Sequence, residues 1–214
     1  MLRVSHIIYK VDHLQQAVED FRRRGFEVEY GTKRRPYNAL IYFSEGPYLE
    51  LLASTGMPKP LKRLLRFFGK DAMVDRLDCW DSHGGGPCGL ALETLKKDLN
   101  EERKVLERQG LGYFLMKSGR NDTKGRKLRF TGLFPDDMQI PFFMTYFNID
   151  PKPRNFTHPN GVKRIRSIAF GTEERYIPLI RELCSDEMLH LFVGKGIKDM
   201  EFEYAPGSTP VSLD

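Results

Sequence analysis

Two ionisable side chains in apolar surroundings are the clearest indication of chemistry in this sequence. His6 stands in the strand-like run Ser5–Val11, and Glu50 stands between leucines in the strand-like run Tyr48–Ala53. A carboxylate placed among leucines is costly to bury without a partner. The two side chains could form a structural hydrogen-bonded pair, or they could act as an acid and a base in a pocket. We therefore take His6 and Glu50 as the candidate catalytic residues.

Further polar and aromatic side chains accompany this pair. Because side chains alternate along a strand, Lys10 is expected on the face of His6, and Tyr48 on the face of Glu50. Lys10, or an arginine from a loop, could hold an anionic substrate, whereas Asn38 could bind a ligand or close a turn. The candidate substrate-binding residues are Lys10, Asn38, Tyr42, Tyr48 and Phe143.

The segments around His6 and Glu50 follow the order β-α-β-β-β. After the first strand, Asp12 and Gln15 have the spacing of a capping box, and a helix with one apolar face is predicted up to Gly25. A glycine after a basic last turn is typical of a helix C-terminus. The remaining strands of this unit are predicted at Phe26–Tyr30, Ala39–Phe43 and Tyr48–Ala53.

The same order returns in the second half of the chain. Cys88–Glu93 is predicted as a strand, Thr94 as a helix cap, and Gly110 as the end of that helix. Strands are then predicted at Leu111–Met116, Lys127–Leu133 and Ile140–Phe147. The repetition indicates an internal duplication of one supersecondary unit.

The sequence therefore predicts an α+β fold with two tandem βαβββ modules, at residues 1–53 and 88–148. A connector at residues 54–87 contains a basic amphipathic helix around Pro60–Phe68. A partial βα unit at residues 158–205 is expected to pack on the same domain, where it completes the sheet or forms an edge.

Composition narrows the class of protein. The chain has 214 residues, a formal net charge of +5 and three cysteines at unrelated spacings, which indicate neither a disulfide framework nor a zinc site. No apolar run reaches the roughly 18 residues of a membrane span, and no signal peptide is recognised, so a cytoplasmic protein is expected. The basic residues are scattered, which makes a nucleic-acid partner unlikely.

Several short motifs resemble one known family. His6-Ile7-Ile8 with Asp12-His13-Leu14, then Tyr37-Asn38-Ala39-Leu40, then Tyr48-Leu49-Glu50-Leu51-Leu52 are similar to the glyoxalase-like branch of the vicinal-oxygen-chelate superfamily. That superfamily includes glyoxalase I, extradiol dioxygenases and bleomycin-resistance proteins. The resemblance covers roughly residues 4–170. It implies that the modules form a curved mixed-sheet cup with helices outside, within one chain or across a homodimer.

The resemblance also implies a divalent metal such as Zn, Ni, Mn or Fe, with ligands from the first and last strand of each module. His6 and Glu50 occupy these positions in the first module. The second module has Cys88 and then Phe143 or Met144 in the corresponding places, so the site is incomplete. His83, Glu93 or His158 could supply a substitute ligand.

Two functions follow from the resemblance. The first is a glyoxalase-like isomerase or lyase, or a dioxygenase-related metalloenzyme, that acts on a small oxygenated metabolite. There Glu50 would be a base oriented by His6, or both would be metal ligands. The second is a non-catalytic protein that sequesters an aromatic or drug-like molecule, as bleomycin-resistance proteins do. A nucleic-acid or protein adaptor that uses the basic connector is a third alternative.

Overall fold

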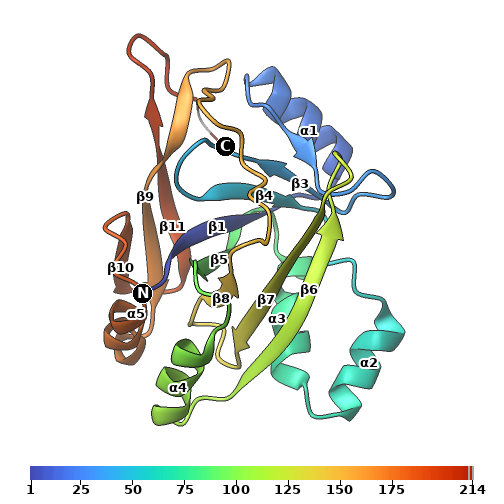
Figure 1. Cartoon of the computed structure of the whole chain (residues 1–214), viewed down its shortest axis with the longest axis vertical. Helices are drawn as coiled ribbons and strands as arrows, with labels where there is room; N and C mark the ends of the chain where they lie inside the picture. The colour runs from blue at the N-terminus through green and yellow to red at the C-terminus, as the bar shows by residue number, and fades with distance from the viewer. Residues whose placement is uncertain (212, 214) are drawn as a thin grey trace.

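Eight strands form one strongly curled sheet, and three further strands form a second sheet beside it (Figure 1). The computed structural model describes residues 1–211 and 213. The strand order of the large sheet is β2-β3-β4-β1-β5-β8-β7-β6, and that of the small sheet is β10-β9-β11. The order of the large sheet has the same pattern on both sides of the β1–β5 pair, as a duplicated unit requires.

The first half of the large sheet is the first predicted βαβββ module. It comprises β1 (Arg3–Lys10), α1 (Leu14–Arg23), β2 (Glu29–Tyr30), β3 (Asn38–Ile41) and β4 (Tyr48–Leu52). β1 pairs in parallel with β4, which brings the strands of His6 and Glu50 side by side. The predicted capping box is wrong, because α1 starts after His13 and has no side-chain cap hydrogen bond.

The second half repeats this arrangement. It comprises β5 (Gly86–Thr94), α4 (Asn100–Arg108), β6 (Tyr113–Asn121), β7 (Lys127–Pro135) and β8 (Phe142–Thr145). β5 pairs in parallel with β8 as β1 does with β4, and β1 and β5 join the modules as antiparallel neighbours. Thr94 is the last residue of β5 and caps no helix, because α4 begins at Asn100, five residues later than predicted. The α+β fold of tandem modules is confirmed.

The C-terminal part forms its own sheet. β9 (Val162–Thr172), the 3₁₀ turn η1 (Glu174–Tyr176), α5 (Ile177–Leu183), β10 (Leu189–Val193) and β11 (Gly196–Tyr204) make up this part. The expectation that it extends or borders the large sheet is wrong. Instead, buried side chains of β9 and α5, such as Ile165 and Leu179, pack into one apolar core with Ile7 of β1.

The connector contains two helices, α2 (Lys59–Phe67) and α3 (Asp71–Ser82), of which only α2 was predicted. Figure 1 shows them at one side of the curled sheet. Lys62 Nζ lies 2.8 Å from Asp78 and 2.6 Å from Asp81, and Arg66 also contacts Asp78, at 2.9 Å. Because acidic residues of α3 pair with these cations, the connector does not offer the uncompensated basic surface that the adaptor alternative needs. None of the helices within residues 1–211 has the length and apolarity that crossing a bilayer requires.

Two helix-ending glycines allow a direct test of packing at the helix ends. Gly25 and Gly110 both have positive φ, +82° and +66°, but a β-carbon at Gly25 would lie 2.8 Å from that of Asn160, whereas Gly110 has open space. We expect Gly110→Ala to cost about 1 kcal/mol of unfolding free energy, from backbone strain alone. Gly25→Ala should cost about 2–3 kcal/mol, because the contact adds to the strain. Urea unfolding measures both, and equal losses would contradict the close approach of Asn160.

Candidate functional site

The concave side of the large sheet encloses a cavity of about 180 Å³. Strands of both modules line it, and α3 covers part of it with Leu77 and Trp80. Most of the lining is apolar or aromatic. The polar side chains that line it are His6, Tyr37, Asn38, Tyr48, Glu50, Thr55, Ser118 and Arg120.

His6 and Glu50 lie together at this cavity. His6 Nε2 is 3.5 Å from Glu50 Oε2, and both side chains are largely buried. The register of the parallel pair explains the distance: His6 is opposite Tyr48 and Ile8 is opposite Glu50, so His6 and Glu50 are diagonal neighbours on one face. The His6 ring stacks on Tyr48 with centroids 4.6 Å apart and meets the edge of Phe142 at 5.5 Å.

Burial sets the charge of this pair. It lowers the pKa of His6 to about 3, with help from the positive charges of Lys152 and Arg120. Burial also raises the pKa of Glu50, against the hydrogen bond that Asn38 Nδ2 donates to Oε1 at 2.7 Å and the positive charge of Arg120. At neutral pH His6 is therefore uncharged, and Glu50 is a stronger base than an exposed carboxylate.

A second network behind His6 determines which ring nitrogen carries the proton. Ser5 Oγ donates a hydrogen bond to Glu93 Oε2 at 2.6 Å and lies 3.1 Å from His6 Nδ1. Because the hydroxyl has one proton and gives it to a carboxylate, Nδ1 must carry a hydrogen and donate to Ser5 Oγ. Glu93 is itself held by Arg3 at 2.8 Å. The free lone pair of His6 is therefore on Nε2 and points toward Glu50.

This network predicts the effect of Ser5→Ala. Without the hydroxyl, Nδ1 loses its acceptor, and we expect ¹⁵N spectra to show a mixture of His6 tautomers where the wild type shows Nδ1–H alone. Any proton-transfer rate that depends on His6 should fall about 10-fold, which is the scale of losses from outer-shell partners. Ser118→Ala is the matched control, since Ser118 lines the cavity without contacting His6. A pure Nδ1–H tautomer in Ser5→Ala would contradict the assignment.

Arg120 is a cavity residue that sequence reasoning did not name. It lies on β6, where its guanidinium donates to Gly31 O at 2.6 Å and to Tyr42 Oη at 2.7 Å. The sequence suggested an arginine from a loop, whereas this one comes from the edge strand of the second module. Alternation along β6 was the available signal, because it turns Ser118 and Arg120 to the same face.

The other candidate residues fall into two groups. Tyr48 and Asn38 line the cavity, and Tyr42 lies behind Tyr48, with ring centroids 5.0 Å apart. Lys10 does not line the cavity, because its Nζ donates to the carbonyls of Val11 and Ala53, at 2.9 Å each. Phe143 lies in the apolar core on the other face of the sheet, and its neighbour Phe142 lines the cavity instead.

The second module offers no ligands to complete a metal site here. The register places Ala91, not Cys88, opposite His6 and pairs it with Phe142. Met144, beyond Phe142 on β8, is a thioether and a poor ligand for a hard cation. The described residues 1–211 and 213 contain no group of three or more His, Cys, Asp or Glu side chains that could hold a metal ion.

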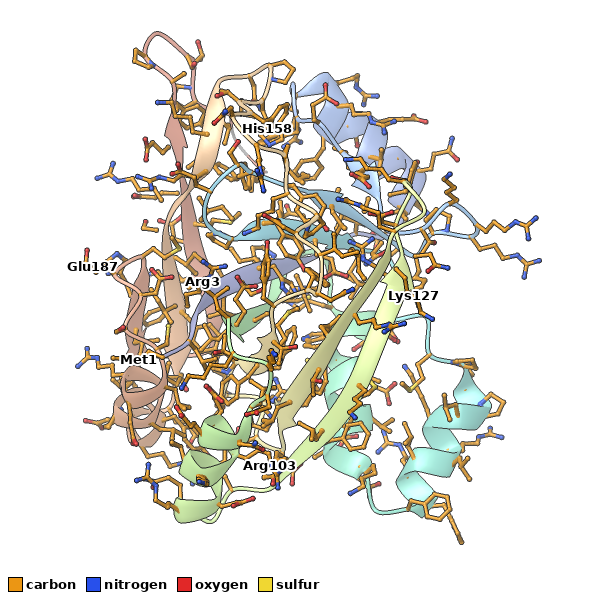
Figure 2. All side chains as sticks on the ribbon, viewed as in Figure 1. Met1, Arg3, Arg103, Lys127, His158 and Glu187 are labelled. Atoms are coloured by element: carbon orange, nitrogen blue, oxygen red, sulfur yellow. The ribbon has the colours of Figure 1, made fainter. Side chains whose placement is uncertain are left out.

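The three proposed substitute ligands are engaged elsewhere or lie outside the cavity lining. Glu93 is behind Ser5, and His83 follows α3 without lining the cavity. His158 is buried against three phenylalanines, and its Nδ1 accepts the Glu27 amide proton at 2.9 Å (Figure 2). His6 and Glu50 alone do not fit a resident divalent metal, which needs three or four protein ligands.

Comparison with known proteins agrees with this fold. A family model described as a glyoxalase-like domain matches residues 4–183. A crystal structure of a hypothetical protein from Staphylococcus aureus is 17% identical, with a TM-score of 0.67 over 100% of this chain and 96% of that one. The Mn(II)-bound glyoxalase from Novosphingobium aromaticivorans is 10% identical, with a TM-score of 0.49 over 85% of this chain and 52% of that one. No curated protein matches the chain.

Proposed function

Because the chain belongs to the glyoxalase-like family of the vicinal-oxygen-chelate superfamily, we propose that it isomerises a small oxygenated acid by proton transfer. The observation that carries this proposal is the buried pair of His6 and Glu50, 3.5 Å apart, in a cavity that also contains the Arg120 guanidinium. A neutral imidazole, a carboxylate of raised pKa and a fixed cation are the groups that moving a proton next to a carbonyl requires.

Each polar residue has one role in this reaction. Arg120 binds the carboxylate of the substrate, and the Tyr48 hydroxyl, which has no partner among the described residues, donates to its carbonyl oxygen. Glu50 takes a proton from the carbon beside that carbonyl, and the electron pair moves onto the oxygen. The proton then returns to the enolate oxygen, so the product is the enol isomer of the substrate. Asn38 Nδ2 donates to Oε1 of Glu50, and once Glu50 carries the proton, its Oε2–H can donate to the lone pair on His6 Nε2.

No step of this reaction needs a bound metal, in keeping with the two-ligand donor set. The test therefore uses chelator-treated protein. A panel of 2-oxo and 2-hydroxy acids is incubated with it in D₂O, and NMR follows deuterium entering the carbon next to the carbonyl. We expect exchange for at least one acid in excess chelator. Exchange that appears only after Zn, Ni, Mn or Fe is added would contradict metal-independent transfer.

A second function is favoured by one observation, the aromatic lining of the cavity. Trp80, Phe134 and Phe142 form a continuous cluster, with Phe134 stacked on Phe142 at 5.1 Å. Such a surface suits sequestration of a flat apolar molecule. Trp80 is the single tryptophan of the chain, so its emission reports cavity occupancy directly. Quenching of Trp80 by aromatic compounds, without exchange of any acid, would establish binding without catalysis.

A further inference from the structure

A wide groove of about 810 Å³ lies outside the cavity, over β6, β7, the end of β8 and the turn at residues 95–97. Every charged side chain that lines it is positive. These side chains are Lys96, Lys97, Lys117, Arg120, Lys127 and Arg129. Figure 2 labels Lys127, the first residue of β7.

The β6–β7 register gathers these cations on one face. Arg129 is opposite Gly119, and Lys127 is opposite Asn121. Lys117 follows on the same face of β6, about 7 Å from position 119 at the strand rise. Arg120 points to the other face, where it contacts Tyr42. A β-carbon at Gly119 would lie only 2.5 Å from Leu128 O, so the glycine allows β6 and β7 to pack closely beside Arg129.

Four of these cations have no counterion among the described residues. Lys96 pairs with Glu101. Within residues 1–211 and 213, no carboxylate lies within salt-bridge distance of Lys97, Lys117, Lys127 or Arg129. The cations of α2 differ from them, because Lys62 and Arg66 pair with carboxylates of α3. Like charges gathered on a fixed strand pair repel each other, and a bound polyanion relieves that repulsion.

The floor of the groove is held in place by hydrogen bonds. Asn148 Oδ1 accepts the Arg129 amide proton at 2.6 Å, and its Nδ2 donates to Lys127 O at 3.2 Å. Thr145 Oγ1 accepts the Thr131 amide proton at 2.9 Å. The cations therefore extend from a fixed backbone surface.

We propose that this groove binds a small molecule with two or three linked phosphate groups. Four unpaired cations exceed what one carboxylate or one phosphate would neutralise. The groove volume lies in the range of small-molecule sites, about 300–1,000 Å³. The groove lies on the other face of the β6–β7 pair from the His6–Glu50 cavity, and the two share the lining residues Ser118, Gly119, Arg120, Phe130 and Phe147.

The experiment is calorimetric titration of the full chain with inorganic tripolyphosphate, in chelator, at low and moderate salt. The test variant is Lys127→Glu with Arg129→Glu. The control is Lys163→Glu with Arg166→Glu on β9, which makes the same change in net charge. We expect one tripolyphosphate per chain, at least 10-fold weaker binding in the groove variant, and less than a twofold change in the control. Glu50→Gln should bind tripolyphosphate like the wild type, which separates this proposal from the proposed function.

Three results would overturn the proposal. They are no binding by the wild type, equal weakening in both double variants, and tighter binding of a 20-nucleotide oligothymidylate that the groove variant abolishes. The last result would assign the groove to nucleic acid. If the charge-reversed variant does not fold, as judged by circular dichroism and Trp80 emission, the variant Lys127→Gln with Arg129→Gln takes its place under the same criteria.

Discussion

Glu50→Gln is expected to lower the rate of deuterium exchange by about 10³-fold, within the range of 10²–10⁴ that a positioned base contributes. The amide has the shape of the carboxylate, so the side chain still fits beside His6 at the cavity. It can also still accept the 2.7 Å hydrogen bond from Asn38 Nδ2. It cannot accept a proton from carbon. Substrate affinity, read from Trp80 quenching, should change less than threefold, because Arg120 remains in place.

The pH profile separates loss of the base from loss of structure. Burial raises the pKa of Glu50, so its carboxylate form accumulates at a higher pH than that of an exposed glutamate. In the wild type the exchange rate should rise with pH through this raised pKa and then level off. The residual rate of Glu50→Gln should lack that rise. A profile with the same rise in Glu50→Gln would exclude Glu50 as the base.

Glu29→Gln is the matched control for this substitution. Glu29 accepts a hydrogen bond from Thr123 Oγ1 and lies outside the cavity lining. Replacing Glu29 removes one negative charge from the first module, as Glu50→Gln does. We expect the exchange rate of this variant to stay within twofold of the wild type. A loss as large as that of Glu50→Gln would mean that charge near the site, not a base in it, sets the rate.

How much of this site the sequence predicts depends on whether a feature follows from neighbouring residues or from contacts between distant ones. Strand alternation is local, and it correctly placed His6, Tyr48 and Glu50 on faces that meet in the cavity. Lys10 is on the same strand face as His6, but it lies at the strand end, where free carbonyls of Val11 and Ala53 take its ammonium. No sequence pattern predicts which carbonyls a lysine will reach, so its position was found only in the structure.

Contacts between the modules were beyond sequence reasoning for a related reason. Arg120 and Glu93 reach the His6 region only because β1 pairs with β5 and the sheet curls, which depends on the register of distant strands. The sequence pattern suggested Cys88 as the counterpart of His6, whereas the observed register places Ala91 opposite it. An error of one residue turns a side chain to the other face, which is why Phe143 was expected where Phe142 lies.

Helix α3 was missed although its sequence has helical spacing. Met73, Leu77 and Trp80 are four and three residues apart and face the sheet. The aspartates at 71, 75, 78 and 81 form the opposite side of the helix and pair with α2. α2 itself was predicted because its basic and apolar residues alternate with helical spacing. Each of the two helices supplies the counterions that the other needs.

Arg76 connects α3 to the second module and carries the largest expected effect on stability. Its side chain is buried, and its guanidinium donates to the carbonyls of Pro135 at 2.6 Å, Asp137 at 2.8 Å and Ile140 at 3.2 Å. These carbonyls lie at the end of β7 and in the turn that leads to β8. Arg76→Met should lower the free energy of unfolding in urea by about 3–5 kcal/mol, because it removes the guanidinium donor from three carbonyls, of which Asp137 O retains only the Ile140 amide at 3.2 Å.

Two further variants distinguish hydrogen bonding from packing. Arg76→Lys retains the charge but has no planar fork to reach three carbonyls, so we expect a loss of about 2 kcal/mol. Arg63→Met on the exposed side of α2 should stay within about 0.5 kcal/mol of the wild type. A wild-type stability for Arg76→Met would mean that the turn satisfies its carbonyls without α3.

Trp80, one turn further along α3, lines the cavity, so release of this helix should change Trp80 emission at lower urea than global unfolding does. The helix that anchors the turn would then also be the element that opens the cavity.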